Sequence, residues 1–421
     1  MALNTFDITT VEQRGGPEWL RILRRDAFER FQARALPTDA EEIWRYSRIA
    51  DLDLAGYGPV ESGQEKGSLP AALVPMLEAI GPRDGLVVSR NGRLVDGAER
   101  PAAGVQLTWG GDQAVAIGDI AGEPDALVAL NTAFVCGPLA IRVSRGTVLD
   151  HPIVVVHWVD EPQGAVFPRT VVTVEENAQA RVVEIMASAD VACLAVPVTE
   201  LDVEAAGRLG YLNVQTLGRR AWQIGLQASR VGADADLVSQ SIAFGGDYAR
   251  VRTDSTLVGK GASSRLLAAY FGDHSQMHDF RTVQAHAGPK TTSDLLFKGA
   301  VANTSHSVYT GLIRIEKGAV GANAFQTNRN LVLDEGAHAD SVPNLEIEES
   351  DVRCSHASAV GPIDEEQHFY LESRGVPPEV ADRLITLGFL DEVLERTPVP
   401  SMLPWLRSTL QAKLDLAELA S

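Results

Sequence analysis

The middle of this 421-residue chain consists of short alternating apolar and polar runs, separated by turns of small residues. The recurring turns pair a small residue with alanine, and they read Asn177-Ala-Gln-Ala180, Gly232-Ala-Asp-Ala235, Gly261-Ala-Ser-Ser264, Gly318-Ala-Val-Gly321 and Gly336-Ala-His-Ala339. Gly232 and Gly261 lie 29 positions apart, and two of the other gaps are about twice that spacing. An irregular repeat of this length is typical of a solenoid, in which each coil stacks on the one before.

These patterns predict a mainly β fold, namely a parallel β-helix with small residues at its tight corners. No helix-length periodic segment lies between the strands, which argues against a sheet of alternating strands and helices. A large antiparallel sandwich with coincidental Gly-Ala turns is the alternative. Helical patterns flank the strands, so we expect an N-terminal helical region and linker (1–84), a β-helix core (85–360) and a C-terminal helical region (361–421).

Prolines and caps mark the elements of the first region. Pro17 suits the first turn of a helix that should end before Pro37. Thr38 and Glu41 form a capping-box pattern, which predicts a second short helix. Residues 55–70 are rich in glycine, proline, serine and charge, and we expect a loop there.

The C-terminal region predicts further helices. Phe369 and Tyr370 are expected to anchor the start of one helix, while Pro378 opens another that Gly388 should stop. After a proline-rich break, a last helix carries a leucine stripe at Leu403, Leu406, Leu410 and Leu414. Such a stripe usually packs in a core, so we expect this tail to dock on the solenoid or on another protein.

Composition and charge exclude several classes of partner. The net charge of −19 repels phosphate backbones and anionic membranes, so neither nucleic acid nor a membrane is expected as a partner. No apolar run is long enough to span a bilayer, and the first residues lack the features of a signal peptide. The three widely spaced cysteines, Cys136, Cys193 and Cys354, do not form a disulfide pattern. A cytoplasmic location is the expectation.

The chain also lacks the usual catalytic motifs. It has no nucleophile elbow, no complete phosphate-binding loop, no metalloprotease helix and no C-x-x-C ligand pair. We therefore expect a protein that is not an enzyme and that depends on partners for ATP hydrolysis.

Cys354 and His356 are the best candidates for a functional site. Residues i and i+2 of a strand point to the same face, so a thiol and an imidazole would project side by side. Both are metal ligands, but two are too few to close a tetrahedral site. Either a second chain supplies further ligands, or Cys354 is a small buried residue with a structural role.

The other histidines have less convincing spacing. His274 and His278 could chelate a metal on a helix, but Gly272 and the neighbouring strands argue against a helix there. We expect His278, Arg281 and His286 to line the surface of a coil, in structural or solvated roles.

At this point the residues resemble the SufB/SufD family of the SUF iron–sulfur cluster assembly system. The C-terminal run Cys354-Ser-His-Ala-Ser-Ala-Val-Gly-Pro-Ile-Asp-Glu-Glu-Gln-His-Phe-Tyr-Leu-Glu-Ser-Arg-Gly375 carries the likeness, together with Glu42-Ile-Trp-Arg-Tyr46 near the N-terminus and His278-Asp-Phe-Arg-Thr282 in the core. Ala339 stands where the SufB pattern has a cysteine, and Ser355-His356 stands where it has a His-Glu pair. These differences favour the SufD branch.

The resemblance implies a right-handed parallel β-helix and a scaffold assembled from several chains. It implies that the edge of the β-helix meets a SufB-like paralogue, with Cys354 and His356 at that interface as ligands for transient iron or an iron–sulfur cluster. No cofactor is expected to bind tightly to the isolated chain, which could form a homodimer through the same edge.

The resemblance further implies that the C-terminal helices dock a SufC-like ATPase. The partner-binding residues expected there are Val380, Leu384, Leu387, Phe389, Leu406 and Leu410. The alternatives are the SufB scaffold itself, a β-helix enzyme that acts on carbohydrates, and a structural adaptor in which Cys354 is inert.

Overall fold

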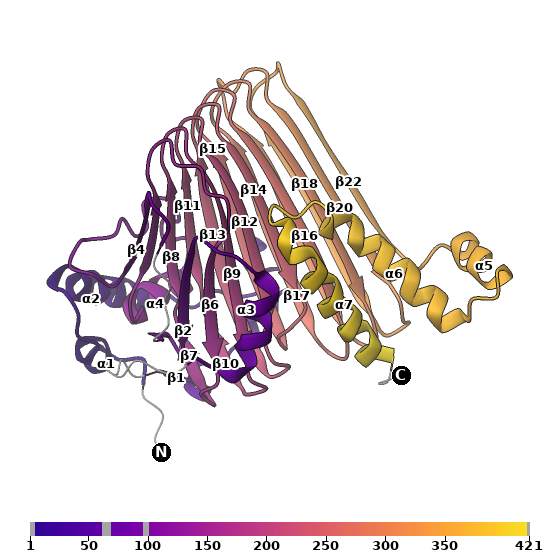
Figure 1. Ribbon diagram of the computed structural model, residues 1–421, viewed down its shortest axis with the longest axis horizontal. Helices are drawn as coiled ribbons and strands as arrows, with labels where there is room; N and C mark the ends of the chain where they lie inside the picture. The colour runs from indigo at the N-terminus through magenta and orange to yellow at the C-terminus, as the bar shows by residue number, and fades with distance from the viewer. Residues whose placement is uncertain (1–4, 61–68, 96–100, 419–421) are drawn as a thin grey trace.

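The computed structural model of the chain describes residues 5–60, 69–95 and 101–418, and its core is a parallel β-helix of two facing sheets (Figure 1). Successive long strands alternate between the sheets, so each coil adds one strand to each. In spatial order the first sheet contains β21 (His338–Ile347), β19 (His306–Ile315), β17 (Met277–His286), β15 (Tyr248–Leu257), β13 (Ala221–Val231), β11 (Val198–Val203), β8 (Arg169–Val174), β5 (Leu139–Val143) and β4 (Val105–Trp109).

The second sheet runs alongside the first. Its order is β22 (Arg353–Gly361), β20 (Asn323–Val332), β18 (Thr292–Val301), β16 (Ser263–Gly272), β14 (Asp236–Ala243), β12 (Arg208–Thr216), β9 (Gln179–Ser188), β6 (Ile153–Val159), β2 (Gly85–Arg90) and β3 (Arg93–Leu94). Three short strands pair off the main path of the first sheet: β1 (Gly58–Pro59), β7 (Gly164–Val166) and β10 (Cys193–Ala195). The parallel pairing confirms the predicted β-helix and excludes the alternative of an antiparallel sandwich.

The small-residue turns lie at the corners of the coils, as predicted. Stacked residues differ by 27 positions between Asp236 and Ser263, and by 31 between Thr292 and Asn323, so the turn length sets the irregular repeat. At one such corner a Cβ added to Gly259 would lie 2.0 Å from the backbone nitrogen of Ala233. Only glycine allows the backbones of successive corners to approach this closely.

The N-terminal helices partly match the prediction. They are α1 (Ile8–Gln13), α2 (Glu18–Gln32), α3 (Val74–Ile80) and the 3-10 turns η1 (Glu42–Trp44), η2 (Ile49–Asp51), η3 (Leu54–Gly56) and η4 (Ala71–Leu73). Helix α2 ends before Pro37, as expected. The prediction of a second helix is wrong. Glu41 does accept a hydrogen bond from the Thr38 N–H at 3.0 Å, but only the 3-10 turn η1 follows. The reason is that the buried side chain of Trp44 holds this segment against the solenoid. The predicted loop at 55–70 falls partly on residues 61–68, outside the described ranges.

The C-terminal helices are α5 (Glu365–Ser373), α6 (Pro378–Leu394), the 3-10 turn η5 (Pro400–Met402) and α7 (Leu403–Glu418). The predicted stop at Gly388 is wrong, because α6 continues for six further residues to Leu394. A helical glycine costs about 1 kcal/mol relative to alanine, which burial of Leu390 and Leu394 outweighs. Phe369 and Tyr370 do not anchor α5 by burial, because their side chains are exposed.

Helices cover part of the outer face of each sheet. On the second sheet, α3, α6 and α7 bury apolar residues such as Val156, Leu267 and Leu406 in one cluster. On the first sheet, α2 and α4 (Ala126–Phe134) pack with residues such as Phe167. No helix in the described ranges combines the length and the apolar character that crossing a bilayer requires.

Candidate functional site

The last coil of the β-helix is open. Among the described residues, β21 pairs only with β19 and β22 only with β20, so each has a free edge. Figure 1 shows β22 as the last strand of its ladder, with α5 projecting beyond it. One hydrogen bond, from the Ser358 hydroxyl to that of Ser341 at 2.7 Å, joins the two edge strands across the opening. The interior side chains of this coil are therefore presented to the outside.

Cys354 and His356 lie on the interior-facing side of β22. Their partners in β20 are Ala324 and Gln326, which are both buried. Cys354 is half-buried against Ile315 and its neighbours, while His356 is exposed. The structure thus places the two candidate ligands on one face of an edge strand, at the opening of the solenoid.

The thiol of Cys354 is not activated by its surroundings. Burial raises its pKa above the ordinary value, so the group is protonated at neutral pH. A metal ion or a nearby positive charge would be needed to convert it to the thiolate that acts as a ligand. Beneath His356, both polar atoms of the Gln326 amide lack a hydrogen-bond partner among the described residues.

The pair does not form a complete metal site by itself. In the described part of the chain, no third histidine, cysteine or carboxylate joins Cys354 and His356 closely enough to complete a ligand set. The other cysteines lie elsewhere: Cys193 is buried, which raises its pKa to about 11, and Cys136 accepts a hydrogen bond from Arg14 at 3.0 Å.

The histidines of β17 are not where the sequence predicted. His278 and His286 are fully buried, and Arg281 is nearly so. Burial lowers the pKa of His278 to about 3 and that of His286 to about 4, so both rings are neutral. His286 contacts the hydroxyls of Thr291 and Ser293 at 2.7 and 2.8 Å. The predicted surface position is wrong, because both imidazoles point from the strand into the solenoid. The structural role that was also predicted agrees with their burial.

Sequence reasoning missed a second group of ligand-type residues. His306 on β19 and His338 on β21 are in register, and Asp340 follows two residues later on the same face. Their donor atoms all lie within 4.8 Å of one another. The available signal was His-x-Asp at 338–340, with another histidine about one coil earlier.

The predicted partner-binding residues divide into two sets. Val380 is partly exposed and Leu384 is exposed on α6, while Leu387 and Phe389 pack partly against the solenoid. Leu406 and Leu410 are buried between α7 and the second sheet, so of the two docking sites expected for the leucine stripe it occupies its own solenoid, and these two residues are not exposed to a partner. The reason is that their leucine stripe holds α7 on its own β-helix.

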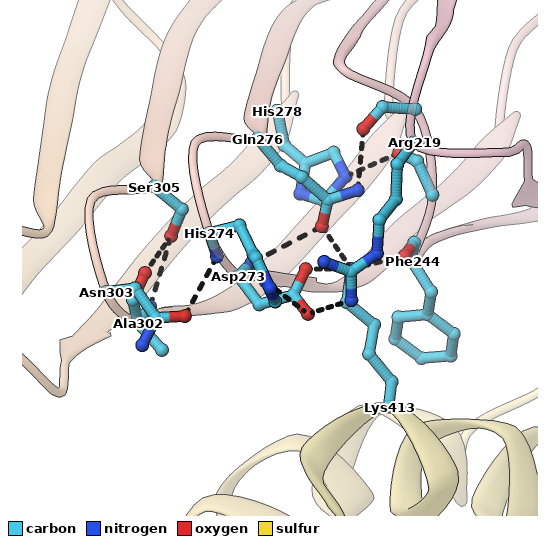
Figure 2. Close-up of polar contacts among 12 residues, drawn as sticks. Arg219, Phe244, Asp273, His274, Gln276, His278, Ala302, Asn303, Ser305 and Lys413 are labelled. Carbon is cyan, nitrogen blue, oxygen red and sulfur yellow. Dashed lines mark hydrogen bonds and ion pairs between the residues drawn. The ribbon is translucent and has the colours of Figure 1, made fainter. Parts of the chain in front are cut away.

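Polar contacts fix α7 to the solenoid (Figure 2). Lys413 reaches from the helix to donate to the carbonyl oxygen of Phe244 and to Gln276 Oε1, and it lies 3.4 Å from the Asp273 carboxylate. Asp273 also pairs with Arg219 at 2.9 Å. Burial lowers the pKa of the Lys413 ammonium to about 8. These buried contacts join α7 to the core of the solenoid.

The helix α5 stands apart from this packing. None of its residues is buried, and Phe369 and Tyr370 are 70% and 57% exposed. A cavity of about 580 Å³ lies between α5, α6, α7 and the solenoid, with His368 and Asp382 in its lining. An exposed aromatic pair of this kind is typical of a surface that another protein covers.

The chain is a β-solenoid whose last coil is open and carries one thiol and one imidazole on the same strand face. The family model for the "SUF system FeS cluster assembly, SufBD core domain" matches residues 157–389, which is more than half of the chain. The chain therefore belongs to the SufBD family of the SUF system, as its resemblance predicted.

Individual relatives agree with this assignment. The chain is 28% identical to the iron–sulfur cluster assembly protein SufD of Escherichia coli over 375 residues, covering 86% of this chain and 85% of the relative. The match to SufD of Bacillus subtilis is 28% over 308 residues, or 68% and 67% of the two chains. An iron–sulfur cluster assembly SufBD family protein of Mycobacterium tuberculosis is 37% identical over 227 residues, 52% of this chain and 57% of that protein. The match thus spans little more than half the length of the mycobacterial relative.

Proposed function

We propose that this protein is a non-enzymatic subunit of a cytoplasmic SUF-type complex that assembles iron–sulfur clusters. In this proposal the open end of the β-helix pairs with a SufB-like paralogue, and the C-terminal helices dock a SufC-like ATPase. The free edges of β21 and β22 are the observation that carries it. Unpaired edges usually receive a partner strand or a protective cover, and neither is present among the described residues.

The open end also explains the choice of ligands. Cys354 and His356 would occupy part of the coordination sphere of iron or of a nascent cluster, and the paralogue would supply the rest. Metal binding displaces the proton of the Cys354 thiol, whose raised pKa otherwise keeps it neutral. The isolated chain would therefore hold no cofactor tightly.

The C-terminal helices offer a mechanical link to the ATPase. Leu384 is exposed on α6, while the other face of α6 contacts the second sheet. Lys298 on β18 donates to the Phe389 carbonyl oxygen at 3.1 Å, and Gln240 on β14 donates to that of Val393 at 2.8 Å. A force applied to the outer face of α6 would pass directly into the strands of the β-helix.

The test is cluster assembly on the purified complex. The chain is co-purified with its SufB-like and SufC-like partners, reconstituted anaerobically with iron and sulfide, and followed by absorption spectroscopy. The double variant Cys354→Ser/His356→Ala is expected to retain the complex and to lose most of the cluster absorption. The matched control is Cys136→Ser, at a half-buried thiol remote in sequence from the open end, which should assemble clusters normally.

Two results would contradict the proposal. Unchanged cluster formation in the double variant would exclude the ligand role. Failure of the wild-type chain to associate with the SufB-like paralogue, or a stable homodimer that persists in its presence, would exclude the pairing.

A further inference from the structure

A second candidate site lies on the outer face of the first sheet, next to its free edge. His306 and His338 are direct neighbours in the β19–β21 ladder, and their rings lie 5.1 Å apart between centroids. Asp340 is two residues after His338, so its side chain leaves the same face of β21. Cys354 belongs to the other sheet and faces the interior of the coil, so the two groups are separate.

The donor atoms of the three residues converge. His306 Nε2 lies 2.8 Å from Asp340 Oδ2, and His338 Nε2 lies 3.3 Å from Asp340 Oδ1. In a first-row metal site with bonds of about 2.0 to 2.2 Å, adjacent ligand atoms are about 3 to 3.5 Å apart. One ligand atom from each residue lies within 4.8 Å of the other two, so side-chain movements of an ångström or so would bring all three onto one ion.

The group is also open to solvent. The side chains of His306 and Asp340 are 31% and 26% exposed, and that of His338 is 67% exposed. A metal ion could enter without unfolding the strand, and water could fill its remaining positions. Hydrogen bonds between groups this exposed contribute little to stability, so fold stability alone gives little reason for the arrangement.

We propose that His306, His338 and Asp340 form a binding site for a divalent first-row transition metal ion, with water completing its coordination. Two imidazoles and one carboxylate suit zinc, iron(II), nickel or copper(II), and exclude the calcium and magnesium that prefer all-oxygen sites. The rigid β ladder sets the positions of both histidines, and the carboxylate lies between them. This site does not depend on the proposed role in cluster assembly.

Zinc binding to the purified chain tests the proposal. Zinc chloride is titrated by calorimetry into the Cys354→Ser/His356→Ala variant, which removes the competing ligands of the open end. One zinc equivalent is expected to bind, and His338→Ala or Asp340→Asn added to this background should weaken that event by at least about 10-fold. His151→Ala is the matched control, because His151 is an exposed histidine in an early coil, and it should leave zinc affinity unchanged.

The readouts separate the two sites and detect misfolding. Cobalt bound at the His-Asp site should lack the intense near-ultraviolet thiolate bands that ligation by Cys354 would add. Thermal unfolding should show that each variant remains folded, and zinc should raise the melting temperature of the background variant but not of its Asp340→Asn derivative. The proposal would be overturned if the background variant bound no zinc. It would also be overturned if the His338→Ala and Asp340→Asn derivatives bound zinc as tightly as the background variant does.

Discussion

The two ends of the β-helix differ in how far their interior side chains are exposed to solvent. At the first coils, β3 pairs antiparallel with β2 and β4 antiparallel with β5, and interior residues such as Ile141 and Val143 are fully buried. At the last coil no further strand follows in the described ranges, and interior-facing Val360 is 44% exposed. Because the same fold closes one end and leaves the other open, the opening is a property of the last coil rather than of solenoids in general.

The interiors of the two halves differ as well. The early coils enclose mainly aliphatic residues, among them Val155, Val172 and Val182, around one buried polar cluster in which the Thr170 hydroxyl donates to the Glu184 carboxylate at 2.6 Å. The later coils enclose polar groups: the Tyr270 hydroxyl donates to Asn330 at 2.7 Å, and Gln284 donates to Ser293 at 2.7 Å. Polar groups are buried in both halves, so the clearer difference is that antiparallel strands cover the first end, whereas the last end is open to contact with a partner.

The largest expected effect comes from placing the same charge at both ends. Val143→Lys would bury an unpaired ammonium, and we expect it to destabilise the protein by more than about 4 kcal/mol or to prevent folding. Val360→Lys occupies the equivalent face of the open coil and should cost about 1 kcal/mol or less. Urea unfolding measures both. Equal losses would show that the last coil is covered in solution.

A smaller contrast separates the two faces of the C-terminal helices. Leu410→Ala removes a side chain that is 1% exposed and should destabilise the protein by about 2 to 5 kcal/mol. Leu384→Ala, at a side chain that is 46% exposed, should cost about 0.5 kcal/mol or less. Under the proposed function, Leu384→Ala should instead weaken binding of a SufC-like ATPase, which calorimetry can measure. A large loss of stability from Leu384→Ala would mean that this face packs within the chain.

The smallest effect concerns pH and the polar interior. The pKa of His286 is about 4 in the folded chain and about 6.5 when unfolded, so the unfolded state binds the proton more readily between these values. Stability should therefore fall as the pH drops below 6.5, and this one group accounts for about 2 kcal/mol at pH 5. His286→Gln should flatten that part of the stability profile, measured by urea unfolding from pH 4.5 to 8. His151→Gln, an exposed control, should leave the slope unchanged.

The features of the fold and of the candidate site that depend on local sequence patterns could be predicted from the sequence. Small-residue turns about 29 positions apart indicated the solenoid, and the two-residue period of a strand placed Cys354 and His356 on one face. The trio at His306, His338 and Asp340 was missed because the two histidines lie 32 positions apart, which is longer than most coils. Their register depends on a turn length that no local pattern supplies.

The C-terminal helices were likewise only partly predictable from the sequence. Its leucine stripe predicted an apolar face, but not whether this chain or another protein would cover it. The structure shows that α7 buries Leu406 and Leu410 on its own β-helix, with Lys413 drawn into buried contacts with Phe244 and Gln276.

The sequence alone determined the strand and turn periodicity, the helical flanks, the family and the shared face of Cys354 and His356. Each of these depends on residues close together in the chain, where backbone geometry relates position directly to direction. Only the tertiary structure decided which coil stays open, which histidines meet and which helix face is covered. Those outcomes depend on the stacking of segments about 30 residues apart, which the summed lengths of the intervening turns control.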